Sequence, residues 1–371
     1  MNYIKALGLM SGTSMDGLDC GLFDIILSQD YLLKWKCITF RTIGYSKSTR
    51  HLIRSALSGD EASILDAHNH LGKTFASHVK EFLKDRKVAI IASHGQTISH
   101  IDGISTCQIG NPKDMNHAFH VPVVYNVRQA DIDVGGNGAP LMPFLDWLIF
   151  KESRKNTITL NLGGVANISY IPVSGIRDEV IGFDTGPGMA MMDEISREIW
   201  GLDMDQDGLK TANGKINSPL LNKLMKIKYI TKPPPKSTSR DEFGLNIVKQ
   251  IIQENPHLIA EDLLRTFCAF TAKSISINIK SILNFNKLNA QLIISGGGIN
   301  HSVLMDDIFK FLKISSIKIS DEYGIDAKMK ESLLMAVLAV ARMKNITANM
   351  PSVSGASMKI ILGDIFNSDS L

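Results

Sequence analysis

The stretch from Thr157 to Asp193 constrains the fold more than any other part of the chain. A β-branched run enters the paired glycines Gly163 and Gly164, an apolar run leaves them, and a later run, Val180 to Phe183, leads directly to Asp184 and Thr-Gly-Pro-Gly. Paired glycines let backbone N–H groups converge on an anion, because no Cβ blocks its approach. The sequence therefore predicts a strand, an anion-binding turn, a second strand and a carboxylate at a strand end. The alternative is a surface turn and an Asp that only caps a helix.

The same design appears at the start of the chain. Tyr3 to Met10 is predicted as a short buried strand, Ser11 to Gly17 as a turn dense in Gly, Ser, Thr and Asp, and Leu18 to Leu27 as a second strand. Hydroxyl and N–H groups in such a hairpin can hold phosphate oxygens, and Asp16 or Asp19 can bind the waters of a metal ion. Two such hairpins, one opening each half of the chain, indicate two related α/β halves that close on one nucleotide. The duplication is weak, because no other repeat period is present.

Composition and charge set modest limits. The 371 residues predict roughly two to three domains, and 44% apolar with 21% charged residues is typical of an ordinary soluble globular protein. The net charge of +3 is not concentrated in a Lys/Arg block, so neither nucleic-acid nor membrane binding is implied. The longest apolar run, Leu333 to Ala341, is too short to span a bilayer, and the N-terminus lacks a signal-peptide pattern, so a cytoplasmic location is expected. The isolated cysteines are expected to be reduced core residues: Cys20, Cys37, Cys107 and Cys268.

Strands and helices alternate in the predicted N-terminal half. Trp35 to Ile43 is predicted as a strand, and Glu61 to Leu83 as a helix, because its apolar residues recur at steps of three and four. Lys87 to Ala92 is predicted as a buried strand that ends in the polar cluster Ser93 to Thr97. Ligands of open α/β sheets bind at the carboxyl ends of the strands, so this cluster is a candidate site. The nearby histidines are expected to be ordinary helix residues rather than metal ligands: His68, His70 and His78.

Arg128 and the glycine-rich stretch after it mark a second candidate site and a domain boundary. The planar guanidinium of Arg128 can bind a carboxylate or phosphate bidentately, although a surface ion pair is the commoner role of an Arg. The stretch 135–140, ahead of a helix that begins near Met142, is interpreted as a hinge. The predicted domain I covers residues 1–134 and about 350–371, and domain II covers 135–349.

The C-terminal half contains a third glycine turn. Gln291 to Ser295 is predicted as a buried strand, followed by Gly296 to Gly298 and a helix from Ser302, an arrangement that presents N–H groups and a helix N-terminus to a ligand. Pro233 to Arg240 is a stiff segment that either delivers Lys236 and two hydroxyls to a site or serves as a linker. Further predicted elements are the helices Glu261 to Ile282 and Ala327 to Met343 and a final strand, Ser357 to Leu362. The acidic stretch 203–215 lacks the closing Glu of a calcium loop, which excludes that site.

Eight strings, in order over nearly the full length, resemble the anhydro-N-acetylmuramic acid kinase family: GLMSGTSMDG, SHGQT, GGNGAPLMP, NLGGVANIS, FDTGPG, PPPKST, SGGGIN and MPSVSGA. The resemblance implies the α/β fold of actin, sugar kinases and heat-shock chaperone ATPases, with two duplicated (ribonuclease H-like) domains and ATP in the cleft. It implies that the chain opens 1,6-anhydro-N-acetylmuramate with water and phosphorylates O6, using ATP and Mg²⁺, during peptidoglycan recycling and amino sugar catabolism. It also implies a homodimer.

The resemblance assigns candidate roles residue by residue. Asp184 matches the catalytic aspartate, and Asp16 is the candidate to approach the metal, which is held mainly by the ATP phosphates. The residues that resemble ATP-binding positions are Gly12, Thr13, Ser14, Met15, Asp16, Gly17, Leu18, Asp19, Asn161, Gly163, Gly164, Asn167, Gly296, Gly297 and Gly298. Those that resemble sugar-binding positions are His94, Gln96, Thr97, Arg128, Asp131, Gly186 and Glu331. Two positions depart from the family pattern: Met189 replaces an Asn, and Asn126 with Val127 replaces Asp-Phe before Arg128.

The implied reaction predicts a role for Asp184 as a base. Opening the 1,6-linkage needs a base that activates water at the anomeric carbon, as a carboxylate does in inverting glycosidases. The expelled oxygen is O6, which the γ-phosphorus of ATP captures, while the glycine hairpins and magnesium neutralise charge on the phosphates. Three alternatives remain open: a kinase of an ordinary, non-anhydro sugar on the same fold, a chaperone-like or regulatory ATP-binding module, and a degenerate relative that has lost its substrate.

Overall fold

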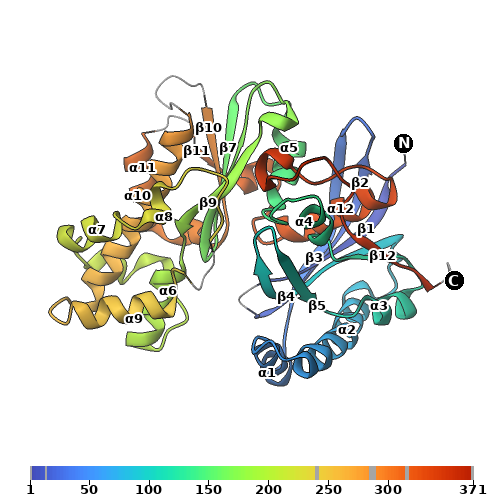
Figure 1. The fold of residues 1–371 in the computed structure, drawn as a ribbon, viewed down its shortest axis with the longest axis horizontal. Helices are drawn as coiled ribbons and strands as arrows, with labels where there is room; N and C mark the ends of the chain where they lie inside the picture. The colour runs from blue at the N-terminus through green and yellow to red at the C-terminus, as the bar shows by residue number, and fades with distance from the viewer. Residues whose placement is uncertain (1, 13–14, 239–241, 284–289, 314–316, 369–371) are drawn as a thin grey trace. The chain divides into compact units, whose positions relative to one another are not determined.

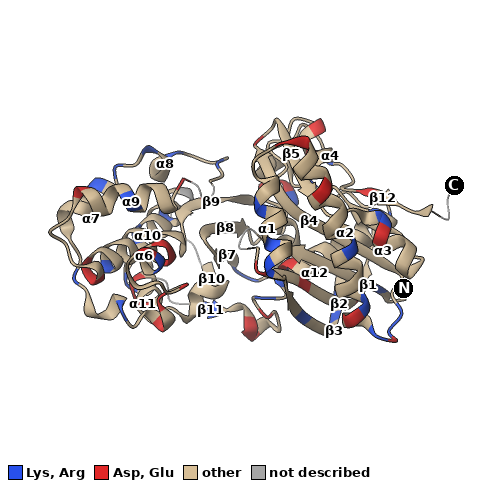
Figure 2. Ribbon diagram, turned by 90° about the horizontal axis from the view of Figure 1, so that it is seen from below, with Lys and Arg blue, Asp and Glu red and all other residues tan. Residues whose placement is uncertain are grey.

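The computed structural model describes residues 2–12, 15–238, 242–283, 290–313 and 317–368 (Figure 1). It divides into two compact units, unit 1 with residues 1–149 and 329–371 and unit 2 with residues 150–328. No helix of the described residues is long and apolar enough to cross a membrane. Lysines and arginines are interspersed with acidic residues over the elements of each unit (Figure 2).

Unit 1 is built on a seven-stranded sheet with the path β12-β6-β4-β1-β2-β3, and β5 pairs with β4 off this path. Its strands are β1 Ile4–Ser11, β2 Gly17–Leu27, β3 Leu33–Gly44, β4 Ile90–Ile101, β5 Ser105–Ile109, β6 Val123–Tyr125 and β12 Asp364–Phe366. Its helices are α1 Lys47–Ala56, α2 Glu61–Leu83, α3 Pro112–Phe119, α4 Gln129–Asp133, α5 Met142–Phe150, α12 Lys330–Met343 and α13 Pro351–Ser354. The predicted helix Glu61 to Leu83 is confirmed residue for residue, and the side chain of Asp60 caps it by accepting from the N–H of Ser63 at 2.9 Å.

Unit 2 is built on a five-stranded sheet in the order β11-β10-β7-β8-β9. Its strands are β7 Asn156–Leu162, β8 Val165–Ile171, β9 Ile181–Pro187, β10 Ala290–Ser295 and β11 Ile317–Ile319. Its α-helices are α6 Ala190–Trp200, α7 Ser218–Leu224, α8 Lys228–Thr231, α9 Leu245–Glu254, α10 Ala260–Leu283 and α11 Ser302–Leu312. Short 3₁₀ turns cover Arg177–Glu179, Gln206–Gly208, Thr211–Asn213, Gly297–Asn300 and Ser320–Tyr323.

The two sheets share one topology. In unit 1 the antiparallel strands β1, β2 and β3 are followed by β4, parallel to β1, and by β6, parallel to β4. In unit 2 the antiparallel strands β7, β8 and β9 are followed by β10, parallel to β7, and by β11, parallel to β10. The order β3-β2-β1-β4-β6 therefore repeats as β9-β8-β7-β10-β11. This repeat confirms the predicted class of two duplicated α/β units.

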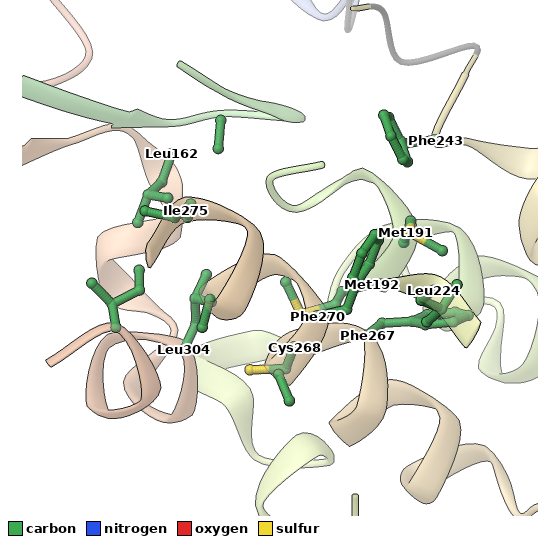
Figure 3. Close-up of a cluster of buried hydrophobic side chains, with 14 of the residues drawn as sticks. Leu162, Met191, Met192, Leu224, Phe243, Phe267, Cys268, Phe270, Ile275 and Leu304 are labelled. Atoms are coloured by element: carbon green, nitrogen blue, oxygen red, sulfur yellow. The ribbon is translucent and has the colours of Figure 1, made fainter. Parts of the chain in front are cut away.

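Helix α10 organises the core of unit 2. Its buried side chains Phe267, Cys268, Phe270 and Ile275 pack with Leu162 of β7 and with residues of α6, α7 and α11 (Figure 3). The apolar residues recur at helical spacing, so one face of the predicted helix is buried against the sheet. Cys20 and Cys268 are buried, as expected of core residues, whereas Cys37 and Cys107 are only partly buried.

Helix α12 is buried along most of its length in unit 1. It packs on β1, β2 and β4, and Leu333 through Ala341 are all buried. Gly8 of β1 allows this contact, because a Cβ there would lie 1.8 Å from the backbone oxygen of Ser332. The apolar run that the sequence shows as too short for a membrane span is thus the central helix of this unit.

The unit boundaries differ from the predicted domain boundaries at both crossings. The contacts divide the chain at 149/150 and 328/329, whereas the predicted domains divide at 134/135, ahead of the glycine-rich stretch, and at about 349/350. The reason is packing: α12 contacts the sheet of unit 1, and Lys330 at its start forms a buried ion pair with Asp146 of α5 at 2.6 Å. The predicted final strand Ser357 to Leu362 is wrong, because the strand here is β12, which pairs with β6.

Candidate functional site

Four polar residues form a row across the sheet of unit 2. Ser295 of β10 pairs with Asn161 of β7, Asn161 pairs with Asn167 of β8, and Asn167 pairs with Asp184 of β9. Directly paired residues project to the same face of a sheet. Neighbouring Leu162, by contrast, packs into the apolar core. The structure therefore brings three of the predicted residues, Asn161, Asn167 and Asp184, together with Ser295, onto one face.

The Gly163-Gly164 turn joins β7 to β8 beside this row. The carbonyl oxygen of Gly163 accepts from the N–H of Met189 at 2.8 Å, and that of Gly164 accepts from Gly188 and Ala190 at 2.9 and 3.0 Å. The start of α6 therefore fixes the orientation of the turn. Because the C=O and N–H groups of a trans peptide point in opposite directions, the N–H of Gly164 is directed away from α6. A donor held in this way suits an anion such as a phosphate.

The Gly296 to Gly298 turn lies against the Gly163-Gly164 hairpin. Gly296 has a φ of 93°, and a Cβ there would lie 2.6 Å from the carbonyl oxygen of Leu162. A Cβ on Gly298 would lie 2.7 Å from the Leu162 Cβ and 3.0 Å from the Met189 Sδ. Glycine is needed because two backbones approach closely here. The two glycine turns of unit 2 are therefore adjacent, and the unusual Met189 places its thioether beside the second of them.

Asp184 lies inside β9 rather than after its end, which corrects the predicted boundary. The pairing with β8 continues to Pro187, with a register shift between Ala166 and Asn167 that leaves Thr185 as the extra residue on β9. The carbonyl oxygen of Thr185 accepts from the Ser274 hydroxyl of α10 at 2.6 Å. A bulge re-aims the side chains next to it, so the contact with α10 helps to set the direction of Asp184.

The Asp184 carboxylate is held by the segment that follows α8. Its Oδ2 accepts from the backbone N–H of Thr238 at 2.9 Å, and its own N–H donates to the carbonyl of Lys236 at 3.2 Å. Tyr229 of α8 donates its hydroxyl to the Asp184 carbonyl at 2.9 Å. The proline segment is thus more than a linker, because it delivers a donor to the candidate catalytic carboxylate. The sequence shows the segment but not this contact, because Thr238 and Asp184 are 54 residues apart and no local pattern pairs them.

Gly186, a predicted substrate-binding residue, is buried in unit 2. Its φ is 134°, and a Cβ there would lie 2.9 Å from the Ser274 Oγ and 3.2 Å from Ile230. Its main role in the structure is to let β9 approach α10 and α8 closely.

A chain of hydrogen bonds supports the start of the first predicted phosphate loop in unit 1. Buried Tyr45 donates its hydroxyl to the Ser11 Oγ at 2.7 Å, and Ser11 donates to the Gln96 Oε1 at 2.6 Å. The Tyr45 N–H also donates to the carbonyl of Asp16 at 2.9 Å. Burial raises the pKa of Tyr45 well above its ordinary value, so the hydroxyl remains a donor. Gln96 is therefore orientated with its amide oxygen toward Ser11.

We expect Tyr45→Phe to destabilise the protein by about 1 kcal/mol, because it removes one buried donor and leaves Ser11 with one fewer partner. The measurement is the midpoint of thermal or chemical unfolding. Tyr3→Phe is the matched control, because Tyr3 is 54% exposed and should lose nothing measurable. Equal stability of the two variants would show that the hydroxyl chain contributes nothing.

The rest of the first loop is described in part. Thr13 and Ser14 lie outside the described residues. Met15 has a φ of 56° and donates its N–H to the carbonyl of Gly12 at 3.1 Å, which closes a tight turn. Asp16 is exposed, and Gly17 and Leu18 begin β2.

Asp19 and Glu331 act on one another within unit 1. The Oδ1 of Asp19 accepts from the Thr42 hydroxyl at 2.5 Å. Burial, and then the negative charge of Asp19, raise the pKa of Glu331, while Arg128 opposes the shift. No group of three or more His, Cys, Asp or Glu within the described ranges could hold a metal ion.

His94 holds Arg128 through a neutral ring. Burial, and then the charge of Arg128, lower the pKa of His94 to about 3, so the ring carries one proton at neutral pH. The Arg128 Nε donates to the His94 Nε2 at 3.0 Å, and the His94 Nδ1 therefore donates to the carbonyl of Gly95 at 3.0 Å. The Arg128 Nη1 donates to the carbonyl of Gly138 at 2.9 Å. Both hydrogen bonds thus anchor the cation through neutral groups, while the charges of Glu331 and Asp102 also act on it.

The cluster around His94 does not follow a strand end as predicted, because β4 continues to Ile101. The parallel pairing of β4 with β6 ends at Ala92, and that with β1 continues past an irregularity after Ser93 to Gln96. Gly95 has a φ of 72°, and from Gln96 onward β4 also pairs antiparallel with β5. His94 thus still lies at the carboxyl edge of the parallel strands. Thr97 lies in the hairpin, where it accepts from the Gln108 side chain at 3.4 Å.

Asp131 is engaged on both carboxylate oxygens. Oδ2 accepts from the N–H of Gly138 at 2.8 Å, and Oδ1 accepts from Asn349 and Ser354 at 2.8 and 2.9 Å. The residue therefore ties the glycine-rich stretch to the C-terminal segment. The unusual Asn126 donates to Asp364 at 2.9 Å.

Comparisons with known proteins give one consistent result. The family model described as anhydro-N-acetylmuramic acid kinase matches residues 4–368. A protein of Clostridioides difficile (strain 630) with that name is 36% identical over 375 residues, 97% of each chain. One of Bacillus cereus (strain AH187) is 34% identical over 375 residues, 96% of this chain and 98% of that one.

One of Bacillus thuringiensis (strain Al Hakam) is 33% identical over 382 residues, 98% of this chain and 99% of that one. Each exceeds 30% identity over almost the whole length of both chains. The motifs found in the sequence and the geometry built from them agree with these matches. The chain therefore belongs to the anhydro-N-acetylmuramic acid kinase family.

Proposed function

We propose that the protein opens 1,6-anhydro-N-acetylmuramate with water and phosphorylates O6 with ATP, which yields N-acetylmuramate 6-phosphate for cell-wall recycling. Membership of the family supports the kinase activity. The observation that carries the mechanism is the row from Ser295 to Asp184, which ends on a carboxylate held by a backbone N–H and lies beside two adjacent glycine turns.

Asp184 acts as the general base in this proposal. It removes a proton from water, whose oxygen forms a bond to the anomeric carbon as the bond from that carbon to O6 breaks. The electron pair of the broken bond goes to O6, which attacks the γ-phosphorus, and the bond to the bridging oxygen breaks to release ADP. Phosphoryl transfer thus replaces the acid that would otherwise protonate O6.

Backbone donors in the glycine turns would bind the phosphates. In unit 2 the N–H of Gly164 is directed away from α6, and the Gly296 turn lies next to it, which suits an extended polyphosphate. In unit 1 the loop that begins at Gly12 is closed by the Met15 N–H and supported by Tyr45. Magnesium, when bound to the phosphates, would reduce their charge, and exposed Asp16 is the candidate side chain for its water shell.

Arg128 would bind the carboxylate of the sugar. Two of its nitrogens are anchored by His94 and Gly138, and burial lowers its pKa only to about 10, so the guanidinium remains charged at neutral pH. Partly buried Glu331 and the amide of Gln96 are further candidates for sugar hydroxyls. Asp131, whose oxygens both bind protein groups, would position the neighbouring loop.

We expect Arg128→Lys to raise the KM of the sugar by about 10- to 100-fold, because it loses the bidentate fork and the bond to His94. The KM of ATP should change little. Steady-state kinetics with each substrate varied in turn provides the measurement. Arg54→Lys is the control, because Arg54 is exposed on α1. A sugar KM that stays at the wild-type value would remove Arg128 from the binding site.

The test of the function is incubation with ATP, magnesium salt and the anhydro sugar in ¹⁸O-labelled water. The expected product is a sugar monophosphate that carries one labelled oxygen at the anomeric carbon. A kinase that phosphorylates a hydroxyl of an ordinary, non-anhydro sugar would introduce no labelled oxygen as the product forms. The label therefore distinguishes that alternative from the proposed reaction. Absence of any phosphorylated product from the anhydro sugar would contradict the proposal.

The location and the assembly remain predictions. Because ATP is consumed, the reaction is expected in the cytoplasm. The homodimer implied by the family resemblance can be tested by analytical ultracentrifugation of the purified chain.

A further inference from the structure

A buried lysine stands at the end of the proline segment in unit 2. Lys236 is 4% exposed, and its Nζ donates to the carbonyls of Tyr229 and Ile230 at 3.1 and 3.2 Å. The ammonium also lies 4.8 Å from the ring centroid of Tyr229 and 5.5 Å from that of Phe183. Burial of a charge is costly unless it finds partners, and here carbonyl dipoles and aromatic faces provide them. The lysine thereby fastens the segment after Pro235 to α8 and β9.

The residues around this lysine are the ones that contact Asp184. Lys236 accepts the Asp184 N–H, Tyr229 donates to the Asp184 carbonyl, and Thr238 donates to its carboxylate. Among the described residues, strand β9 is at the edge of its sheet, and none of their strands pairs with it beyond Asp184. Thr238 is only two residues beyond Lys236, so a docked Lys236 helps to hold the Thr238 N–H toward Asp184, together with the bond from the Thr238 hydroxyl to Glu242.

We propose that Lys236 is a positioning residue, whose buried ammonium docks the 229–238 segment and so aims the Asp184 carboxylate at the water it activates. The inference rests on the proposed role of Asp184 as the base. A misplacement of about 1 Å at a catalytic group can cost about 100-fold in rate, so the docking matters for turnover more than for substrate binding.

The environment of Lys236 adds a pH dependence. Burial, and then the charge of Lys232, lower the pKa of Lys236 to about 8, and Asp184 opposes the shift. The groups that face the ammonium are Asp184 from β9, Tyr229 from α8 and Lys232 after α8. The amine is charged below this pKa and neutral above it. Docking by the ammonium should therefore weaken, and kcat should fall, as the pH rises through about 8.

The test compares Lys236→Met with Lys232→Met, which removes a charge from an exposed position four residues earlier. We expect Lys236→Met to lower kcat by about 10- to 100-fold, while the KM of ATP changes less than about twofold. The decline in kcat near pH 8 that we expect for the wild type should be absent from Lys236→Met. Lys232→Met should keep its kcat at pH 7, and its alkaline decline should move to higher pH, because a charge that lowers the pKa of Lys236 is gone.

A Lys236→Met variant with kcat within about twofold of wild type, or with an unchanged alkaline decline, would overturn the inference. If that variant does not fold, the pH dependence of kcat for the wild-type protein decides. A wild-type kcat that stays constant from pH 7 to about 9.5 would also overturn the inference. An inactive Asp184→Asn beside a normal Lys236→Met removes only this inference. An active Asp184→Asn removes the assignment of the base and this inference with it, whereas the reaction itself is tested by the labelled-water experiment.

Discussion

Replacing Asp184 with asparagine is expected to lower kcat by about 10²- to 10⁴-fold, the range that a general base contributes. Asparagine has nearly the same shape, and its amide oxygen can still accept the Thr238 N–H that binds Asp184 Oδ2 at 2.9 Å. What is lost is the basic oxygen that removes a proton from water. Ring opening and ADP formation should fall together, because the same expelled oxygen attacks phosphorus.

The affinity for ATP should survive the change. Isothermal titration with ATP on the Asp184→Asn variant provides the measurement, and Asp203→Asn, at an exposed position of unit 2, provides the control for both kinetics and binding. Turnover near the wild-type value would refute the assignment of the base. Loss of ATP binding together with turnover would point instead to a structural role for the residue.

Replacing Gly8 with alanine is expected to produce the largest loss of stability. The new Cβ would lie 1.8 Å from the backbone oxygen of Ser332 and 2.7 Å from the backbone nitrogen of Ala336. Both atoms belong to α12, which is buried and packs on β1, β2, β4 and β6, so neither can move independently. Overpacking of this kind costs about 3 kcal/mol or more. The melting temperature of unit 1 should fall by about 10 °C.

Gly44→Ala is the matched control for this substitution. A Cβ on Gly44 meets only the Asp16 carbonyl oxygen at 3.8 Å, an ordinary contact. Its stability should be unchanged or slightly higher, because alanine restricts the unfolded chain. Differential scanning calorimetry of both variants tests the prediction. If Gly8→Ala melts at the wild-type temperature, β1 and α12 do not pack as described.

Several elements could be predicted because their signals are local. The predicted helix Glu61 to Leu83 matches α2, and the strand–glycine–helix pattern at Gly296 matches β10, its turn and α11. Helical spacing and the freedom of glycine are properties of a few neighbouring residues, so they are visible without a partner. The glycine turns and Asp184 also follow from the local pattern, and the family motifs added the roles assigned to them.

Other features depended on residues distant in the chain. Ser93 to Thr97 was predicted after a strand, but β4 continues because β5 supplies a partner for it. Asp184 was predicted at a strand end, but β8 extends β9 to Pro187. The sequence leaves two roles open for the segment that includes Lys236, and they are distinguished by the Thr238 N–H that binds Asp184 and by the packing of Tyr229 and Phe183 around the ammonium.

By itself the sequence determined the fold class, the glycine turns and the candidate base, because each is written in short motifs whose backbone requirements are local. Only the tertiary structure decided that α12 belongs to unit 1, that Asn161, Asn167 and Asp184 share one row, and that Lys236 docks beside the base. Strand register, burial and the cost of an enclosed charge depend on neighbours in space, and those neighbours come from distant parts of the chain.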